Sequence, residues 1–398
     1  MNMVDVSRKG SKRGTTRRSI LSVLVAIMVV LWLFYLIALD SSASFLDSSS
    51  LSSLDMPKST MPIVTATNVS NHEMLQLVEK RLISYKVPPV SCSMALRQVR
   101  TGETTDPNEG KLYARYTNEP IHFWISVHHE KYDATRWSMF EQFGFYYERI
   151  LSNIFQQVLS GKEGHVLDVG GNIGWFALLS ASLGAQVATF EPHRVNYLRM
   201  CESMCLNGWL HGSDTDCMSG SKDPFVQERI HIFPYAASEH EGQLQFHENS
   251  WNPGMGQVNK DRSENSTVVK AVTLDGMVAA LGWSNVDIDI LKVDVEGAEV
   301  EVFLGAKQLL ASKRVQNIFM EGNLRSQREK DDLKRIAMLL VESGYVLHMI
   351  GGYSGPESTN VPPVDEKFYS SLLDSCGDVH SKIKREQCNI WWKGSHAQ

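Results

Sequence analysis

A short apolar segment that leads directly into a glycine-rich turn constrains the fold of this chain more than any other feature. Residues 165–169 are mostly apolar and show no polar alternation, which predicts a strand buried on both faces of a parallel sheet. Gly170, Gly171 and Gly174 then allow a sharp turn, and residues 175–179 continue at helical period. Because the turn follows the carboxyl end of a strand, we expect it at the edge where open α/β sheets bind ligands.

A second predicted strand, residues 186–190, also ends in an acid, Glu191. A carboxylate at this position can accept hydrogen bonds from both hydroxyls of a ribose. Pro192 ends the strand because proline lacks an N–H donor. Asp168, just before the glycine turn, would repel a pyrophosphate but suits a cationic amino-acid group. These features favour S-adenosylmethionine as the bound cofactor.

A dinucleotide-binding fold is the main alternative, since it also places an acid about 20 residues beyond a glycine turn. Its fingerprint needs glycine at the first, third and sixth positions. Counted from Gly170, the third position is Asn172 and the sixth is Trp175. The fingerprint is therefore absent, and a nicotinamide cofactor or a purely structural turn is the less favoured interpretation.

Charged residues interrupt a third apolar segment, residues 286–306. The sequence predicts a buried strand that carries Lys292 and Asp294, followed by a helix that starts at Glu296 and Gly297. Buried charges without partners cost several kcal/mol, so these side chains should pair with one another or face a site. Asp294 and Glu296 lie at the carboxyl end of the strand and are the better site candidates. For Lys292 alone, a structural ion pair stays open.

The segments 167–174, 190–192, 236–238, 273–275 and 291–299 together resemble the FkbM family of S-adenosylmethionine-dependent O-methyltransferases. The resemblance covers about residues 145–350 and implies an α/β fold with a doubly wound, Rossmann-like sheet of seven strands. It implies cofactor contacts from Asp168, Gly170, Gly171, Asn172, Gly174, Glu191, Pro192 and Ala236. Two features depart from the family pattern. Gly171 replaces the usual alanine, which should only loosen the turn, and residues 210–228 form a long insert.

Methyl transfer to a hydroxyl depends mainly on positioning, and a general base would help because a sugar hydroxyl is a weak nucleophile. The candidate catalytic residues are Asp294, Glu296 and Lys292, with Glu321 as a further carboxylate, and Asp294 or Glu296 is favoured as the base. Lys292 orients one of these carboxylates or, with a lowered pKa, acts itself. Glu299 either shares a helix face with Glu296 or is a solvated acid of the first helical turn.

The remaining pattern predicts elements that alternate between strand and helix, as a doubly wound sheet requires. Two histidines, His128 and His129, lie in a polar segment ahead of the core and are predicted on the surface. A loop over 249–265 is predicted to be a mobile lid. The other predicted elements are a helix with an apolar face over 143–158, strands 230–235, 315–321, 345–350 and 389–392, an antiparallel pair 243–246 and 268–272, and helices 273–281 and 333–343.

The amino-terminal segment has the properties of a membrane anchor. Residues 20–39 are apolar except for Ser22, and about 20 such residues are needed to cross a bilayer. Six basic residues precede this run, which predicts a cytosolic amino terminus. A cleaved signal peptide is the alternative, although its apolar part usually spans only about 7–15 residues. The expected segments are a basic tail (1–18), a transmembrane signal anchor (19–39), a serine-rich stem (40–75), a helical cap region (76–160) and the methyltransferase domain (161–398).

Anchor, stem and distal domain together resemble the plan of Golgi-resident glycan-modifying enzymes, which implies a type II membrane protein with a luminal domain and a glycan or small-molecule acceptor. All six cysteines lie beyond the apolar run, where an oxidising lumen would allow disulfides. Cys201, Cys205 and Cys217 lack the second close pair of a zinc site, so no metal is expected. The acceptor sequons at Asn68 and Asn265 fit the same compartment. A net charge of −6 argues against nucleic acid as a partner.

Two other functions stay open at this point. A membrane-tethered glycosyltransferase is suggested by the topology and by Asp287-Ile288-Asp289, although that triplet begins a predicted strand instead of ending one. A non-catalytic binding module that retains the fold is the second, and the intact Asp168, Glu191 and Asp294 argue against it.

Overall fold

The computed structural model describes residues 71–103, 111–117, 121–129, 131, 147–210, 229–249, 253–259, 266–323, 326–349 and 387–394. The predicted anchor, the sequon at Asn68, Asn265 of the second sequon and Cys217 lie outside these residues. The described part of the loop predicted over 249–265 contains a 3-10 turn at 253–255 and a short strand at 257–259. Among the helices that the structure describes, none has the length and apolarity needed to cross a bilayer.

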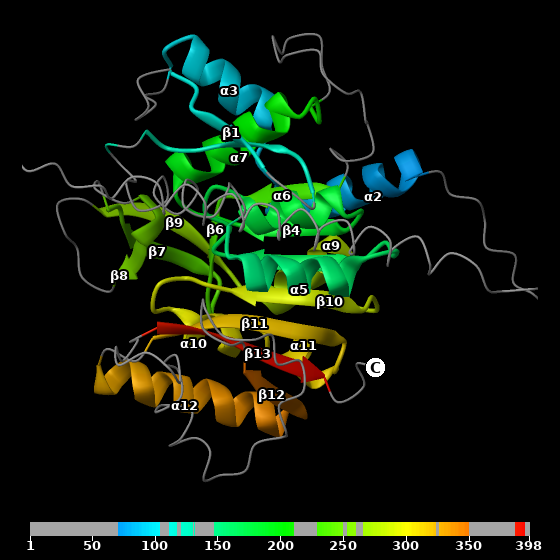
Figure 1. Ribbon diagram of the computed structural model, residues 1–398, viewed down its shortest axis with the longest axis vertical. Helices are drawn as coiled ribbons and strands as arrows, with labels where there is room; N and C mark the ends of the chain where they lie inside the picture. Colours follow the sequence, from blue (N-terminus) through cyan, green and yellow to red (C-terminus); the bar gives the residue numbers. More distant parts are fainter. Residues whose placement is uncertain are drawn as a thin grey trace, which may run out of the picture. The chain divides into compact units, whose positions relative to one another are not determined.

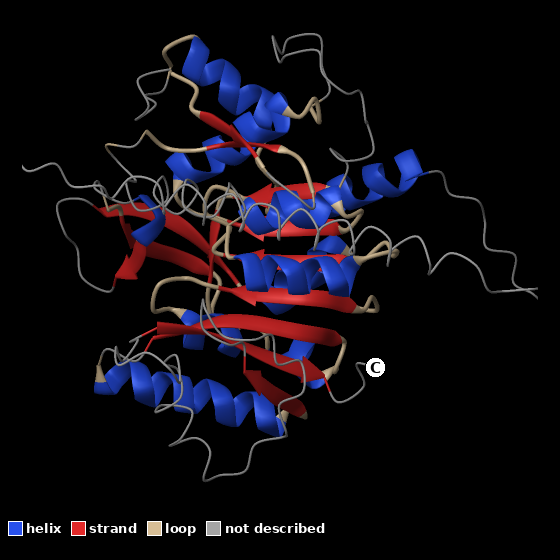
Figure 2. Cartoon of the chain, viewed as in Figure 1, coloured by secondary structure: helices blue, strands red, loops and turns tan. Residues whose placement is uncertain are grey.

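A seven-stranded sheet forms the centre of the fold (Figures 1 and 2). The strand order is β12-β13-β11-β10-β3-β4-β5. β13 runs antiparallel to both of its neighbours, whereas the five strands from β11 to β5 are parallel. The predicted doubly wound sheet is therefore confirmed. Its strands are β3 (His165–Val169), β4 (Gln186–Phe190), β5 (Ile230–Phe233), β10 (Ile288–Val293), β11 (Val315–Asn323), β12 (Tyr345–Met349) and β13 (Gln387–Gly394).

Helices cover both faces of this sheet, because alternate strand residues point to opposite sides. Val166 and Ile290 pack into a core with α5 (Arg149–Leu159), α6 (Trp175–Ser182) and α7 (Arg194–Leu206). Figure 1 shows α5 and α6 in front of the sheet. Leu167 and Leu291 pack into the opposite core. The helices on that side are α9 (Leu274–Leu281), α10 (Glu299–Leu304), α11 (Lys307–Ala311) and α12 (Gln327–Glu342).

A smaller sheet of four strands adjoins the main one, with the order β6-β9-β7-β8. The predicted antiparallel pair is confirmed, with Leu244 opposite Val269. The single strand predicted over 230–235 is wrong in one respect: β5 ends at Phe233 and a separate β6 follows Pro234, which has no N–H to continue a ladder. The strands are β6 (Tyr235–Ala237), β7 (Gly242–His247), β8 (Gln257–Asn259) and β9 (Ser266–Val272), and the 3-10 turn η1 spans Pro253–Met255.

The segment predicted as a helical cap contains strands as well as helices. It comprises α2 (Asn71–Ser84), α3 (Cys92–Arg100) and the antiparallel pair β1 (Ala114–Tyr116) and β2 (Trp124–Ser126). α2 thus begins inside the residues predicted as stem. A disulfide between Cys92 and Cys201 joins α3 to α7, and Cys205 is also disulfide-bonded. The predicted surface position of His128 is wrong: the ring is buried, and its Nε2 lies 2.9 Å from Oδ1 of Asn196.

His231 on β5 gives the fold an expected acid sensitivity. Burial lowers the pKa of this imidazole to about 4 from its ordinary value near 6.5. The unfolded chain therefore binds a proton at a higher pH than the native chain does, and stability falls as the pH drops from 6.5 to 4. We expect a loss of about 1–3 kcal/mol across this interval at His231. Urea unfolding of the wild type and of His231→Gln at pH 7 and pH 4.5 measures this loss in the free energy of unfolding. An equal loss in both proteins would show that His231 is not its source.

Candidate active site

The glycine turn between β3 and α6 packs directly against the end of β10. The N–H groups of Gly170 and Gly171 both donate to the carbonyl oxygen of Phe190, at 2.9 and 3.0 Å. Gly170 has φ +81°, and a Cβ atom there would overlap the backbone oxygen of Asp294. Only glycine fits this position. The turn lies at the switch point of the sheet, between β3 and β10, where the strand order reverses.

Gly171 is required for a reason that the sequence did not reveal. A Cβ atom at this position would overlap the hydroxyl of Thr189 and lie 2.9 Å from Cε of Met200. The Thr189 hydroxyl donates to Oδ2 of Asp168 at 3.3 Å. The hydroxyl therefore occupies the space that an alanine methyl group would need, and the expectation that glycine only loosens the turn is wrong.

Glu191 fixes the shape of the turn from β4. Its Oε2 accepts the N–H of Asn172 at 2.7 Å, and its Oε1 accepts the N–H of His193 at 2.9 Å. Asn172 has the left-handed φ of +52°, which this hydrogen bond stabilises. Oε1 also accepts a hydrogen bond from Nδ2 of Asn196 at 3.4 Å, and the Glu191 side chain is buried. The predicted contact of Glu191 with ribose hydroxyls stays a prediction.

Replacing Glu191 with alanine should weaken the binding of S-adenosylmethionine by about 1–3 kcal/mol, because charge-assisted hydrogen bonds to ribose and the anchor of Asn172 are both lost. Titration calorimetry measures the dissociation constant. Glu163→Ala, at an exposed acid before β3, is the matched control and should leave it unchanged. An unaltered dissociation constant in Glu191→Ala would remove the ribose role.

Three charged groups meet beneath the turn. Nζ of Lys292 lies 3.1 Å from Oδ2 of Asp294 and 3.9 Å from Oδ1 of Asp168. Burial alone would lower the pKa of Lys292, but Asp294, Asp168 and Glu148 outweigh burial and hold that pKa above its ordinary value. Burial raises the pKa of Asp168 despite the opposing charge of Lys292. Lys292 therefore stays protonated, which contradicts the lowered pKa that a basic role would need and agrees with its role of orienting carboxylates.

The loop after β10 differs from the sequence-based expectation. The predicted helix start at Glu296 and Gly297 is wrong, because α10 begins at Glu299 and both earlier residues have left-handed backbones, with φ of +55° and +104°. Glu299 is buried, and its Oε1 accepts the N–H groups of Val295 and Gly297 at 3.3 and 3.1 Å. Neither role suggested for Glu299 holds, since its carboxylate clamps the loop that presents Glu296.

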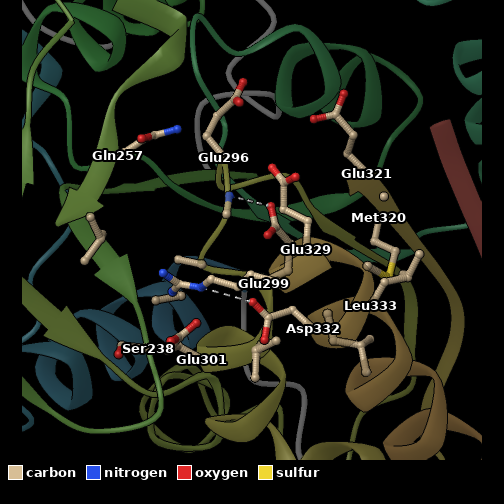
Figure 3. A pocket seen from close by; sticks show the side chains of 18 of the residues that line it. Ser238, Gln257, Glu296, Glu299, Glu301, Met320, Glu321, Glu329, Asp332 and Leu333 are labelled. Carbon is tan, nitrogen blue, oxygen red and sulfur yellow. Dashed lines mark hydrogen bonds and ion pairs between the residues drawn. The ribbon is translucent and has the colours of Figure 1, made fainter. Parts of the chain in front are cut away.

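Two cavities adjoin this loop. The smaller one, of about 40 Å³, is lined by the glycine turn, Lys292 and Asp294, and also by Tyr147 and Glu148 at the start of α5. The larger one, of about 740 Å³, lies between the second sheet, α10 and α12. Figure 3 shows that Glu296 and Glu299 line it from the loop side and that Glu321 and Glu329 line it from β11 and α12.

Three carboxylates converge here, two from the loop after β10 and one from β11; Asp294 lines the small cavity, and Glu296 and Glu321 line the large one. Asp294, Glu296 and Glu321 each offer an oxygen, and these oxygens lie within 4.8 Å of one another. Such a group can hold a divalent cation or accept protons and hydrogen bonds. The structure thus brings together the three carboxylates that the sequence suggested as possible bases.

Three of the predicted cofactor residues line the smaller cavity. Gly170, Gly171 and Asn172 line it, whereas Asp168, Gly174, Glu191 and Pro192 are not among its lining residues. The side chain of Ala236 packs with Phe246 and Val269 in the core of the second sheet. Sequence reasoning missed Glu148 as a lining residue, and it placed Tyr147 only on the apolar face of a helix. Trp175 and Phe176 also line the cavity, and Nζ of Lys292 lies 5.3 Å from the ring centre of Phe176.

The acidic triplet that suggested a glycosyltransferase has structural partners. Oδ2 of Asp289 accepts the N–H of His165 at 2.9 Å, and its Oδ1 pairs with Lys162. Asp287 lies 3.2 Å from a guanidinium nitrogen of Arg314. These contacts join the amino ends of the central strands, at the edge opposite the site, so the triplet gives a glycosyltransferase no support.

Comparison with known proteins agrees with this geometry. Residues 168–347 match the methyltransferase FkbM domain. No curated protein matches the chain.

Solved structures of methyltransferases show weak likeness. A SAM-dependent methyltransferase from Agrobacterium tumefaciens shares 10% identity over 72% of this chain and 71% of its own, with a TM-score of 0.33. Precorrin-6y C5,15-methyltransferase from Geobacter metallireducens shares 9% identity over 62% of this chain and 89% of its own, with a TM-score of 0.28. A SAM-dependent O-methyltransferase from Thermotoga maritima shares 11% identity over 74% of this chain and 80% of its own, with a TM-score of 0.29. These TM-scores are low, so the domain match carries the assignment.

The site also fits the cofactor of such a domain, because a close glycine turn and a surplus of carboxylates suit a cationic ligand. Residues 168–347 therefore match the methyltransferase FkbM domain, and this match supports S-adenosylmethionine as the cofactor.

Proposed function

We propose that this protein is an S-adenosylmethionine-dependent O-methyltransferase that acts on a hydroxyl group of a carbohydrate or another hydroxylated acceptor. The observation that carries the proposal is the group Asp294, Glu296 and Glu321, whose carboxylates meet between the small cavity at the glycine turn and the large cavity. A base placed between a donor and an acceptor cavity is what methyl transfer to a weakly acidic hydroxyl requires.

Within this group, Glu296 is the proposed general base. S-adenosylmethionine, when bound, supplies a methyl group activated on a sulfonium. Glu296 lines the large cavity and can take the proton of an acceptor hydroxyl as that oxygen attacks. Asp294 is paired with Lys292 at 3.1 Å, so its proposed role is to fix the end of β10 at the small cavity. Most of the rate enhancement comes from holding the two reactants in line.

The large cavity suits an acceptor with several hydroxyl groups. Its lining is rich in hydrogen-bonding side chains, which include Ser238, Gln257 and the carboxylates of Glu296, Glu321 and Glu329 (Figure 3). Carboxylates only accept hydrogen bonds, and a sugar offers many donors to them. The volume of about 740 Å³ lies within the usual range of about 300–1,000 Å³ for small-molecule sites.

Isotope-labelled S-adenosylmethionine, incubated with the detergent-solubilised chain and a panel of oligosaccharides, tests the proposal. Labelled methyl ethers on at least one glycan are the expected result. Transfer only to nitrogen or carbon atoms would exclude O-methylation. Cofactor binding without transfer to any acceptor would instead favour the non-catalytic binding module.

We further propose that the protein is a type II membrane protein, anchored by residues 19–39, with its catalytic domain in the Golgi or another secretory compartment. The disulfides at Cys92–Cys201 and Cys205 support this location, because disulfides persist in oxidising compartments. In sealed microsomes, the domain should resist added protease until detergent opens the membrane. Digestion of the domain in intact vesicles would contradict a luminal location.

A further inference from the structure

The small cavity has the size and charge of a site for an amino-acid group. Its volume of about 40 Å³ equals the space of about three water molecules, which is far less than a nucleoside needs. Lys292 and Asp294 line it at the end of β10, and Glu148 lines it from the start of α5. One ammonium and two carboxylates thus surround a space that admits only one end of a ligand.

Glu148 has an unusual conformation for the residue that precedes a helix. Its backbone is left-handed, with φ +42° and ψ +58°, a conformation that costs a non-glycine residue about 1 kcal/mol or more. It makes no side-chain cap to α5, although acids and amides at this position commonly accept an N–H of the first turn. Glu148 instead lines the cavity, and its Oε2 accepts a hydrogen bond from Nδ2 of Asn389 on β13 at 3.4 Å.

The strained residues in the described part of the chain concentrate at this site. Besides Glu148, Asn172 at the small cavity and Glu296 at the large cavity have positive φ, whereas Lys86 and Lys313, which also have positive φ, line neither cavity. Such conformations persist where the surrounding structure enforces them, and they cluster at ligand-binding sites. Glu148 is also one of the carboxylates that hold the pKa of Lys292 above its ordinary value, so its charge reaches the cavity.

We propose that Glu148 binds the α-ammonium group of S-adenosylmethionine and makes the small cavity specific for the amino-acid end of the donor. The inference rests on the proposed function, since it takes S-adenosylmethionine as the donor. Lys292 lines the same cavity, so the wall presents an ammonium beside the carboxylates, an arrangement that suits the zwitterionic end of an amino acid. Glu148 acts in binding and not in the transfer step.

Titration calorimetry of the detergent-solubilised full-length chain tests the proposal with three ligands. These are S-adenosylhomocysteine, its analogue without the α-amino group, and 5′-methylthioadenosine, which lacks the amino-acid end. For Glu148→Gln, which keeps the shape of the side chain, we expect the affinity for S-adenosylhomocysteine to fall about 10- to 100-fold. The affinity for 5′-methylthioadenosine should not change. Glu163→Gln, at an exposed acid before β3, is the matched control.

The wild type alone tests whether the protein recognises the α-ammonium group, and this test holds whether or not the Glu148→Gln variant folds. It should bind the deaminated analogue about 10- to 100-fold more weakly than S-adenosylhomocysteine. Equal affinities for these two ligands, or equal losses of S-adenosylhomocysteine and 5′-methylthioadenosine in the variant, would overturn the inference. A wild-type chain that binds none of the three ligands would instead refute the proposed function.

Discussion

Replacing Glu296 with glutamine should reduce the turnover number of methyl transfer by about 10²- to 10⁴-fold, the usual contribution of a general base. Glutamine keeps the size of the side chain but cannot take a proton from the acceptor hydroxyl. The left-handed backbone of residue 296 and the clamp from Glu299 do not involve the Glu296 carboxylate. The loop should therefore keep its shape, and the dissociation constant of S-adenosylmethionine should stay within about twofold of the wild type.

Single-turnover kinetics with labelled donor and a saturating acceptor measures this effect without a contribution from product release. Glu301→Gln is a matched control, since Glu301 lines the same large cavity but is not one of the three converging carboxylates. It should change turnover less than tenfold. Wild-type turnover in Glu296→Gln would exclude this residue as the base, and a large loss in Glu321→Gln alone would assign the role to the neighbouring carboxylate.

The central strands were predictable because local pattern and length agree there with tertiary structure. The segments 165–169 and 186–190 are mostly apolar, with glycine or proline within two residues of each end, and the observed β3 and β4 have these same limits. The break between β5 and β6 had a readable signal in Pro234, which the sequence analysis did not use. The helical expectation for the cap failed because β1 and β2 are three residues each, too short for a periodic pattern.

The site was predictable where its residues follow a strand and not where they come from distant segments. Asp294 and Glu296 follow β10, so their position at the ligand-binding edge could be inferred from the motif alone. Glu148 lies far from Lys292 in sequence, and no local pattern connects the two. The sequence suggested an exposed helical acid at Glu299, because the dipeptide Glu296-Gly297 is compatible with either a helix start or a turn. The observed hydrogen bonds from Val295 and Gly297 to Glu299 form only because the chain makes the turn.

His128 and Gly171 show the same limit for burial. A histidine in a polar segment has no local signal for burial, and His128 is buried because Asn196 on α7 lies beside it. The need for glycine at 171 arises from Thr189 on the neighbouring strand. Sequence patterns therefore predicted which charged residues lie near the glycine turn, whereas the contacts that position them required the packing of elements far apart in the chain.

Replacing both Cys92 and Cys201 with alanine should lower the free energy of unfolding by about 2–5 kcal/mol. The two residues are 109 positions apart, and the bond closes a loop that includes β3, α6 and β4. For a loop of about 100 residues, the lost restriction of the unfolded chain corresponds to about 4.7 kcal/mol in the chain-entropy description. Both sulfur atoms are buried between α3 and α7, so their removal also costs packing at that contact.

Urea unfolding without reductant measures this loss as a lower midpoint, and the slope with urea should increase because the unfolded chain without the cross-link exposes more surface. Met204→Leu, at a buried residue of the same helix, is the matched control and should cost less than about 1.5 kcal/mol. Dithiothreitol should destabilise the wild type more than it destabilises the double variant, because the variant retains only the other disulfides. An unchanged midpoint in the double variant would show that α3 is held on α7 by packing alone and would remove the support that this disulfide gives to an oxidising compartment.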